Sequence, residues 1–227
     1  MPRSGGRAIS HNTALHRVVG IGVRPLVNTR VTPNQLTAAR LLTGIGAACA
    51  LAVGEPSWRV AGAVLFVFSL LLDRADGMLA RLRGVETEFG HRFDLFSDSA
   101  CNALVFVGLG IGLRGSALGG WAIPMGFAAG GAVVWILFQV VQMEAMDGAR
   151  AGELSGAAGF DPDDGILAVP IGVLLGFSVP LLALAAIVAP VFALIHQRIL
   201  RTKARRLAGA ASASDPSASV SDPSASA

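Results

Sequence analysis

Six apolar runs follow one another along the chain, and polar or charged residues separate each run from the next. A helix that crosses a hydrocarbon core of about 30 Å needs about 20 predominantly apolar residues. The fifth run is short and rich in Gly and Pro, so it must tilt or recruit flanking residues to cross. The pattern predicts an all-α integral membrane bundle of six transmembrane helices, at residues 35–54, 57–81, 93–113, 119–143, 165–178 and 180–199.

Two segments flank this bundle. Between Asn12 and Asn28, apolar residues recur near helical spacing, which predicts an amphipathic helix lying in the interface, either with a binding role or as a plain lead-in. After Leu207 the chain is rich in Ala and Ser and repeats SDPSAS, a composition typical of disorder. We therefore expect a cytoplasmic N-terminal segment (1–30), a membrane domain (31–206) and a disordered tail (207–227).

The distribution of Lys and Arg predicts the orientation. These residues gather in the N-terminal segment, in the connection between the second and third runs, and at the C-terminus, whereas the alternate connections hold only Arg59 and Arg114. Loops rich in Lys and Arg stay in the cytoplasm, and Trp is enriched at membrane interfaces. Both termini are therefore expected inside a cell (inner or plasma) membrane, with Trp58 and Trp121 at the outer face.

The composition narrows the class of protein. A hydrophobic content of 53%, a charged content of 15% and a mean hydropathy of +0.61 exclude an ordinary soluble domain, and we expect no nucleic-acid partner. Cys49 and Cys101 have no spacing typical of a zinc site or a disulfide framework. Small residues four apart, such as Gly126 and Gly130, allow close packing of helices within one bundle or between the two copies of a homodimer.

Four carboxylates interrupt the apolar pattern where the second run ends and the third begins: Asp73, Asp76, Asp94 and Asp98. A charged side chain at the centre of a bilayer costs roughly 2.5–3.5 kcal/mol on insertion scales. Spacings of i, i+3 on one helix and i, i+4 on the next place each pair on one helical face. Because the connection between the two helices is short, the two pairs are expected to surround one pocket at the cytoplasmic interface.

A pocket lined by four carboxylates is suited to bind divalent cations. Hard ions take carboxylate, phosphate and water oxygens, and two ions about 3.5–4 Å apart can activate a phosphoryl group. Gly77, Ala80 and Gly90 leave space beside the acids, and Arg81 offers a fork for phosphate. Two alternatives are structural ion pairs with Arg74, Arg81 and Arg92, and an ion or proton transporter. A transporter would place its acids near mid-bilayer or in matching halves, and neither pattern is visible.

The same residues carry a resemblance to a known family. The sequence Asp73-x-x-Asp76-Gly77-x-x-Ala80-Arg81, then eight residues, then Gly90-x-x-x-Asp94-x-x-x-Asp98, resembles the signature of the CDP-alcohol phosphotransferases (CDP-alcohol phosphatidyltransferases) with every fixed position filled. The segment TPNQLTAAR, from Thr32 to Arg40, is similar to the one that opens their first membrane helix. The resemblance covers about residues 11–206, and six helices fit the fold of the family.

The resemblance implies a metal-dependent step of phospholipid biosynthesis. A CDP-alcohol, usually CDP-diacylglycerol, would bind two divalent ions, an acceptor hydroxyl would attack the phosphorus that bears the lipid, and CMP would leave. At the matching positions, Asp73, Asp76, Asp94 and Asp98 would hold the metals, with Mg²⁺ expected and Mn²⁺ as the alternative. Asp98 would also be the general base. Gly77, Ala80, Arg81 and Gly90 would line the CDP site.

The acceptor is the less defined partner. Arg150, Arg198 and Arg201 are candidate contacts for a phosphorylated acceptor, whereas the acidic residues between Asp161 and Asp164 argue against an anionic one. These acids equally suit the start of a helix. Further candidates to face the acceptor are Gln142, Glu144, His196 and Gln197, although each alone is more typical of a satisfied residue at the membrane interface. A small alcohol is therefore expected, with its identity open.

Overall fold

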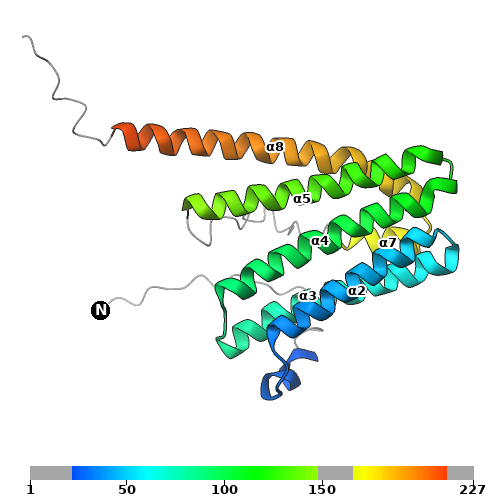
Figure 1. Cartoon of the computed structure of the whole chain (residues 1–227), viewed down its shortest axis with the longest axis horizontal. Helices are drawn as coiled ribbons and strands as arrows, with labels where there is room; N and C mark the ends of the chain where they lie inside the picture. Colours follow the sequence, from blue (N-terminus) through cyan, green and yellow to red (C-terminus); the bar gives the residue numbers. More distant parts are fainter. Residues whose placement is uncertain (1–21, 148–165, 214–227) are drawn as a thin grey trace, which may run out of the picture.

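The structure, a computed structural model, describes residues 22–147 and 166–213, and these contain helices and no strand. This confirms the all-α prediction for that part of the chain. The elements in chain order are η1 (Arg24–Asn28), α2 (Pro33–Val53), α3 (Pro56–Arg83), α4 (Glu88–Gly112), η2 (Leu113–Gly115), η3 (Gly119–Trp121), α5 (Ala122–Asp147), α7 (Ala168–Leu174) and α8 (Ser178–Ala213) (Figure 1).

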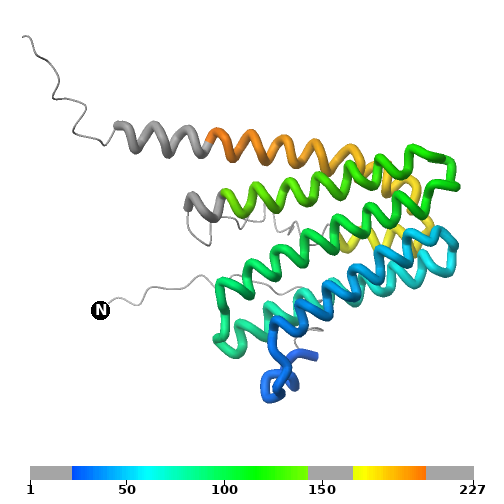
Figure 2. Tube along the Cα trace, viewed as in Figure 1, coloured from blue at the N-terminus to red at the C-terminus, as the bar shows by residue number. Residues whose placement is uncertain are grey.

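The long helices lie side by side. Helix α2 packs against both α3 and α4, and α5 packs between α4 and α8, while the short α7 contacts α3 and α8. The trace in Figure 2 shows the α3–α4 connection at one end of the bundle and the α2–α3 and α4–α5 connections at the other. Trp58 and Trp121 lie where α3 and α5 begin, at the end opposite the α3–α4 connection.

Four helical segments of the described chain are long and apolar enough to cross a membrane: Pro33–Val53, Glu88–Gly115, Gly119–Gln142 and Ser178–Thr202. Helix α3 is not among them, and it carries six charged residues from Arg59 to Arg83. Helix α7, in the place of the fifth predicted run, has only 7 residues. The count of six transmembrane helices therefore stays a prediction.

Local sequence signals explain where the helices near the acids begin and end. Thr32 caps α2 reciprocally, because its hydroxyl accepts from Gln35 N (3.3 Å) and Gln35 Oε1 accepts from Thr32 N (3.0 Å). Thr87 Oγ1 accepts from Gly90 N (3.0 Å), so α4 starts at Glu88, before the apolar run of residues 93–113, and includes Gly90. Gly84, at φ 62°, ends α3 in the left-handed conformation and turns the chain into α4.

Small residues bring the helices into close contact inside the chain. A Cβ on Gly44 would lie 2.8 Å from Cys101 Cβ, which shows how tightly α2 approaches α4. On α5, a Cβ on Gly126 or Gly130 would lie 2.6 or 2.7 Å from a backbone oxygen of α4. The glycines spaced four apart thus pack α5 on α4 within one molecule, and a homodimer stays a prediction.

Arg83 fastens the segment before α2 to the end of α3. Its Nε donates to Val27 O (3.0 Å), its Nη1 to Val31 O (2.5 Å), and its Nη2 to Leu26 O and to Thr29 O (2.8 Å). Most of the interfacial helix predicted at 12–28 lies outside the described residues, and its last part is the 3₁₀ helix η1. At the other end, α8 continues past Leu207 to Ala213, and the rest of the predicted tail lies outside the described residues.

Candidate metal and phosphoryl-transfer site

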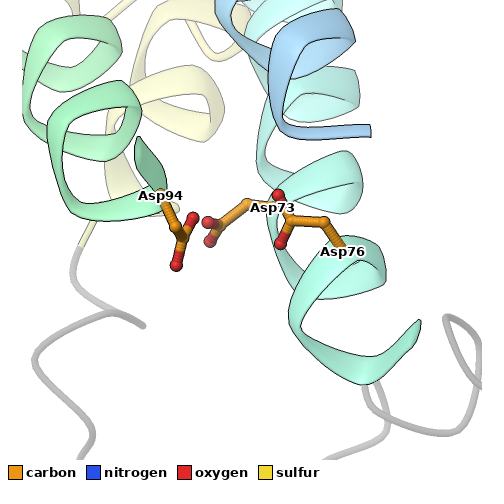
Figure 3. Close-up of side chains that lie close together, drawn as sticks. All are labelled: Asp73, Asp76 and Asp94. Atoms are coloured by element: carbon orange, nitrogen blue, oxygen red, sulfur yellow. The ribbon is translucent and has the colours of Figure 1, made fainter. Parts of the chain in front are cut away.

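Three of the four predicted carboxylates converge from two helices. Asp73 and Asp76 lie in the last three turns of α3, and Asp94 lies in the second turn of α4. One carboxylate oxygen from each lies within 4.8 Å of the other two (Figure 3). Asp76 is buried, whereas Asp73 and Asp94 are half-buried. Three anionic oxygens at this separation are a donor set that suits a hard divalent cation.

Asp76 has a hydrogen-bond partner on a third helix. The hydroxyl of Thr37, which is buried on α2, donates to Asp76 Oδ2 at 2.6 Å. This bond satisfies one oxygen of the most buried acid and fixes its orientation, which is the usual role of a residue behind a metal ligand. Thr37 belongs to the segment TPNQLTAAR, but the sequence pattern does not indicate its contact with an acid.

Arg40 is the second site residue that the sequence analysis missed. Its side chain is fully buried on α2; Nη1 contacts Asp73 and also Asp94 Oδ1 (3.1 Å), and Nη2 contacts Asp98 Oδ1. A signal was present, because Arg40 is the only charged residue of Pro33–Val53 and a charge in an apolar helix is functional by default. Three of the acids thus pair with an arginine of α2, and Arg92, one of the partners considered for structural ion pairs, pairs with Glu88 (2.6 Å).

Asp98 has different surroundings from the other three acids. Its Oδ1 accepts from Arg40 Nη2 and from Asn102 Nδ2 (2.9 Å), and its side chain is 46% exposed. The described residues that cluster as possible metal ligands are Asp73, Asp76 and Asp94, without Asp98. The structure thus joins Asp98 to the cluster through Arg40, and its own place among the metal ligands stays a prediction.

The small residues of the motif and Arg81 lie on the same two helices as the acids, near the end of α3 and the start of α4. A Cβ on Gly77 would lie 3.8 and 3.9 Å from the two terminal nitrogens of Arg81, so that guanidinium lies beside the open backbone of α3. A Cβ on Gly90 would lie 3.2 Å from Asn34 Oδ1, which brings the start of α2 to the start of α4. Ala80 is half-buried and Arg81 is exposed. Their common role as a CDP site stays a prediction.

The structure does not place the candidate acceptor residues beside the four acids. Arg150 and the acids from Asp161 to Asp164 fall outside the described residues. Arg198 and Arg201 are exposed on α8. Arg201 lines a cavity of about 250 Å³ between α5 and α8, together with Trp135, Phe138, Gln139, Gln142, Gln197 and Leu200. None of the four acids lines this cavity, so the structure does not bring Arg201 and the acids into one pocket.

A polar contact ties α5 to α8 beside this cavity. His196 is buried, and its Nδ1 lies 2.6 Å from Gln139 Oε1, while Gln139 Nε2 donates to Ala193 O at 3.2 Å. Hydrogen bonds of this kind hold helices together in membranes. His196 therefore has a packing role between the two helices.

Comparisons with known proteins agree with the geometry. A family model described as CDP-alcohol phosphatidyltransferase matches residues 30–205. A comparison with curated protein sequences gave no significant match.

Solved structures with a similar fold include three of phosphatidylinositol phosphate synthase (PgsA1) from Mycobacterium tuberculosis. The apo form is 23% identical with a TM-score of 0.59, over 78% of this chain and 94% of that one. The form with CDP-DAG bound is 24% identical with a TM-score of 0.60, over 79% and 93%. The complex with manganese and citrate is 24% identical with a TM-score of 0.58, over 78% and 88%. At these identities the likeness concerns the fold.

Proposed function

Because the chain belongs to the CDP-alcohol phosphatidyltransferase family, and is therefore a phosphatidyltransferase of the membrane, we propose that it transfers a phosphatidyl group from CDP-diacylglycerol to a small alcohol. The reaction releases CMP and depends on a divalent metal ion held by Asp73, Asp76 and Asp94. The observation that carries this proposal is the approach of the three carboxylate oxygens to within 4.8 Å of one another.

The residues at the cluster fit a divalent ion. Their oxygens are hard ligands, two of the three side chains are partly open to solvent, and Thr37 orients the third. A bound ion would neutralise the diphosphate of the donor and the departing CMP. Mg²⁺ is the expected ion and Mn²⁺ the alternative, which is supported by the manganese complex of the similarly folded PgsA1. The count of two ions, with Asp98 as a further ligand, stays a prediction.

The donor is proposed to lie along α3 and the start of α4. Gly77 and Ala80 have no bulky side chain, so a ligand can approach the backbone of α3, and the exposed guanidinium of Arg81 lies beside Gly77. An arginine fork suits the paired oxygens of a phosphate group. The structure of PgsA1 with CDP-DAG bound supports this class of donor. Gly90 would complete the CDP site on the α4 side.

Asp98 is proposed to take the proton of the acceptor. Both of its described contacts use Oδ1, and 46% of the side chain is exposed, so Oδ2 is the oxygen that an incoming hydroxyl can reach. As the acceptor oxygen bonds to the phosphorus that bears the lipid, its proton moves to Asp98. The bond from that phosphorus to the CMP oxygen breaks, and CMP leaves with the electron pair.

The acceptor and the orientation are proposed from charge. Arg150, Arg198 and Arg201 are the proposed contacts of a phosphorylated acceptor, and Arg198 and Arg201 are exposed on α8. The excess of Lys and Arg in the N-terminal segment, between the second and third apolar runs and at the C-terminus supports cytoplasmic termini and a cytoplasmic site. The α3–α4 connection, which follows Arg81 and Arg83 in the last turn of α3, would then face the cytoplasm.

The direct test uses the purified chain in lipid nanodiscs with radiolabelled CDP-diacylglycerol, Mg²⁺ or Mn²⁺, and a panel of glycerol phosphate, inositol phosphate, inositol, serine and glycerol. CMP release together with a labelled lipid product from one acceptor supports the proposal. Asp94→Asn serves as the inactive control, and Glu88→Gln, on the same helix but exposed, serves as the active one. Absence of CMP release with every acceptor and both ions would contradict it.

A further inference from the structure

Arg40 has no role in the proposed reaction, although it lies among the acids. It is fully buried, and its two terminal nitrogens divide between two groups of acids: Nη1 contacts Asp73 and Asp94, and Nη2 contacts Asp98. We propose that Arg40 is the positioning residue of the centre, which holds Asp98 in register with the metal-binding acids so that it can take the proton of the acceptor. This inference rests on the proposed function.

The backbone that carries Arg40 is itself fixed by both helices that carry the acids. Its carbonyl oxygen accepts from Ser69 Oγ of α3 at 3.0 Å and lies 3.8 Å from Cys101 Sγ of α4. One turn later, Gly44 lets α2 approach Cys101 so closely that a Cβ would overlap it. The guanidinium therefore projects from a backbone with little freedom to shift, as a positioning role requires.

The contacts of the guanidinium require its forked shape. A planar guanidinium presents separate N–H donors in a rigid arrangement, whereas the ammonium of Lys is a single point charge on a flexible stem. Asp98 Oδ1 receives Nη2 of Arg40 on one side and Asn102 Nδ2 (2.9 Å) on the other. These two donors hold that oxygen and leave Oδ2 for the acceptor. A lysine could keep the charge near the acids without holding both groups.

The charge of Arg40 has a second effect. Three carboxylates, those of Asp73, Asp76 and Asp94, cluster together, and the buried guanidinium of Arg40 contacts Asp73, Asp94 and the separate Asp98. Removal of one partner from a buried ionic group leaves uncompensated charge and destabilises the protein strongly. A neutral replacement would therefore combine loss of folding with loss of positioning, so the charge-conserving Arg40→Lys is the informative variant.

The experiment compares Arg40→Lys with Asp98→Asn and with the double variant, and uses Arg92→Lys, an exposed arginine on α4, as the matched control. Mn²⁺ binding is followed by electron paramagnetic resonance, CDP-diacylglycerol binding by equilibrium dialysis, and turnover by CMP release. We expect Arg40→Lys to bind Mn²⁺ and donor near the level of the unmodified protein while kcat falls by roughly 10²–10⁴-fold, the contribution of a positioned base.

The double variant distinguishes a positioning role of Arg40 from a merely structural one, because it shows whether the two losses of kcat add. If Arg40 acts through Asp98, then adding Arg40→Lys to Asp98→Asn lowers kcat little further, because residues that act as a unit are not additive. Full turnover of Arg40→Lys, loss of Mn²⁺ binding together with kcat, or fully additive losses would each overturn the inference. If Arg40→Lys does not fold alone, it is purified with Mn²⁺ and CDP-diacylglycerol bound, because ligands that bind the folded state stabilise it, and the same comparison is made. An unmodified protein that binds no Mn²⁺ and releases no CMP would instead contradict the proposed function.

Discussion

The hydroxyl of Thr37 on α2 lies 2.6 Å from Asp76 Oδ2 on α3, and this bond reaches the most buried acid of the centre from a helix that carries no acid. Helix α2 therefore supports the site from behind, through Thr37 at one acid and through Arg40 at the others.

Thr37→Val should weaken metal binding by roughly 10–100-fold, the usual effect of removing a residue that orients a metal ligand. The size of the side chain is kept, while the hydroxyl that donates to Asp76 and also contacts the carbonyl oxygen of Pro33 (3.2 Å) is lost. Titration of Mn²⁺ measures the change. Thr43→Val is the control, because that hydroxyl bonds only to carbonyls of its own helix. Equal affinity of Thr37→Val and Thr43→Val would show that Asp76 needs no orientation.

Asp73→Asn and Asp94→Asn should each reduce metal affinity and donor binding, because each removes an ionised oxygen from a site of three. Activity is measured as a function of Mg²⁺ concentration, and the concentration that gives half-maximal activity should rise in each variant. Full activity of the unmodified protein in excess chelator would exclude the metal site.

Asp98→Asn should retain metal and CDP-diacylglycerol while transfer slows by roughly 10²–10⁴-fold. The amide keeps the size of the side chain and one oxygen but cannot accept the proton of the acceptor. Single-turnover release of CMP after addition of acceptor measures the step. Parallel loss of binding and turnover would make Asp98 a ligand instead, and near-normal release would leave the base unassigned.

Gly77→Ala should fold at least as well as the unmodified protein, since the nearest atoms to the added Cβ are the flexible ends of Arg81 at 3.8 and 3.9 Å, and Ala is the better helix former. If the α3 surface at Gly77 receives the donor, the methyl group should raise KM for CDP-diacylglycerol by roughly tenfold, about 1.4 kcal/mol. Thermal unfolding and KM are measured together, with Gly131→Ala, a helical glycine in open space, as the control. An unchanged KM would place the donor elsewhere.

The orientation can be tested with single cysteines in a background where Cys49 and Cys101 are replaced by Ala. Labels at Ser57→Cys and Ala117→Cys should react from outside intact cells, whereas Glu86→Cys and Arg205→Cys should react only after permeabilisation. The reverse pattern at both pairs would invert the topology.

The two helices that carry the acids, α3 and α4, could be predicted from the sequence, because each contains an apolar run of helical length, which is a local signal. The face shared by Asp73 and Asp76 also follows from helical spacing. Thr37 and Arg40 were not found, because their contacts depend on the rotation of α2 between two neighbours. Close packing at Gly44 sets that rotation, and the spacing of residues along α2 alone does not reveal it. The separation of Asp98 from the other acids depends on Arg40 in the same way.

The anchoring of α2 also determines which parts of the centre are free to respond to a ligand. Arg83 holds the chain just before α2 by four carbonyls, Ser69 holds the carbonyl of Arg40, and Thr37 and Arg40 are buried. The side chains that retain exposure are those of Asp73, Asp94, Asp98 and Arg81. We therefore expect the main chain of the centre to have the same form with and without its substrates, and the entropy lost on binding to come from these four side chains.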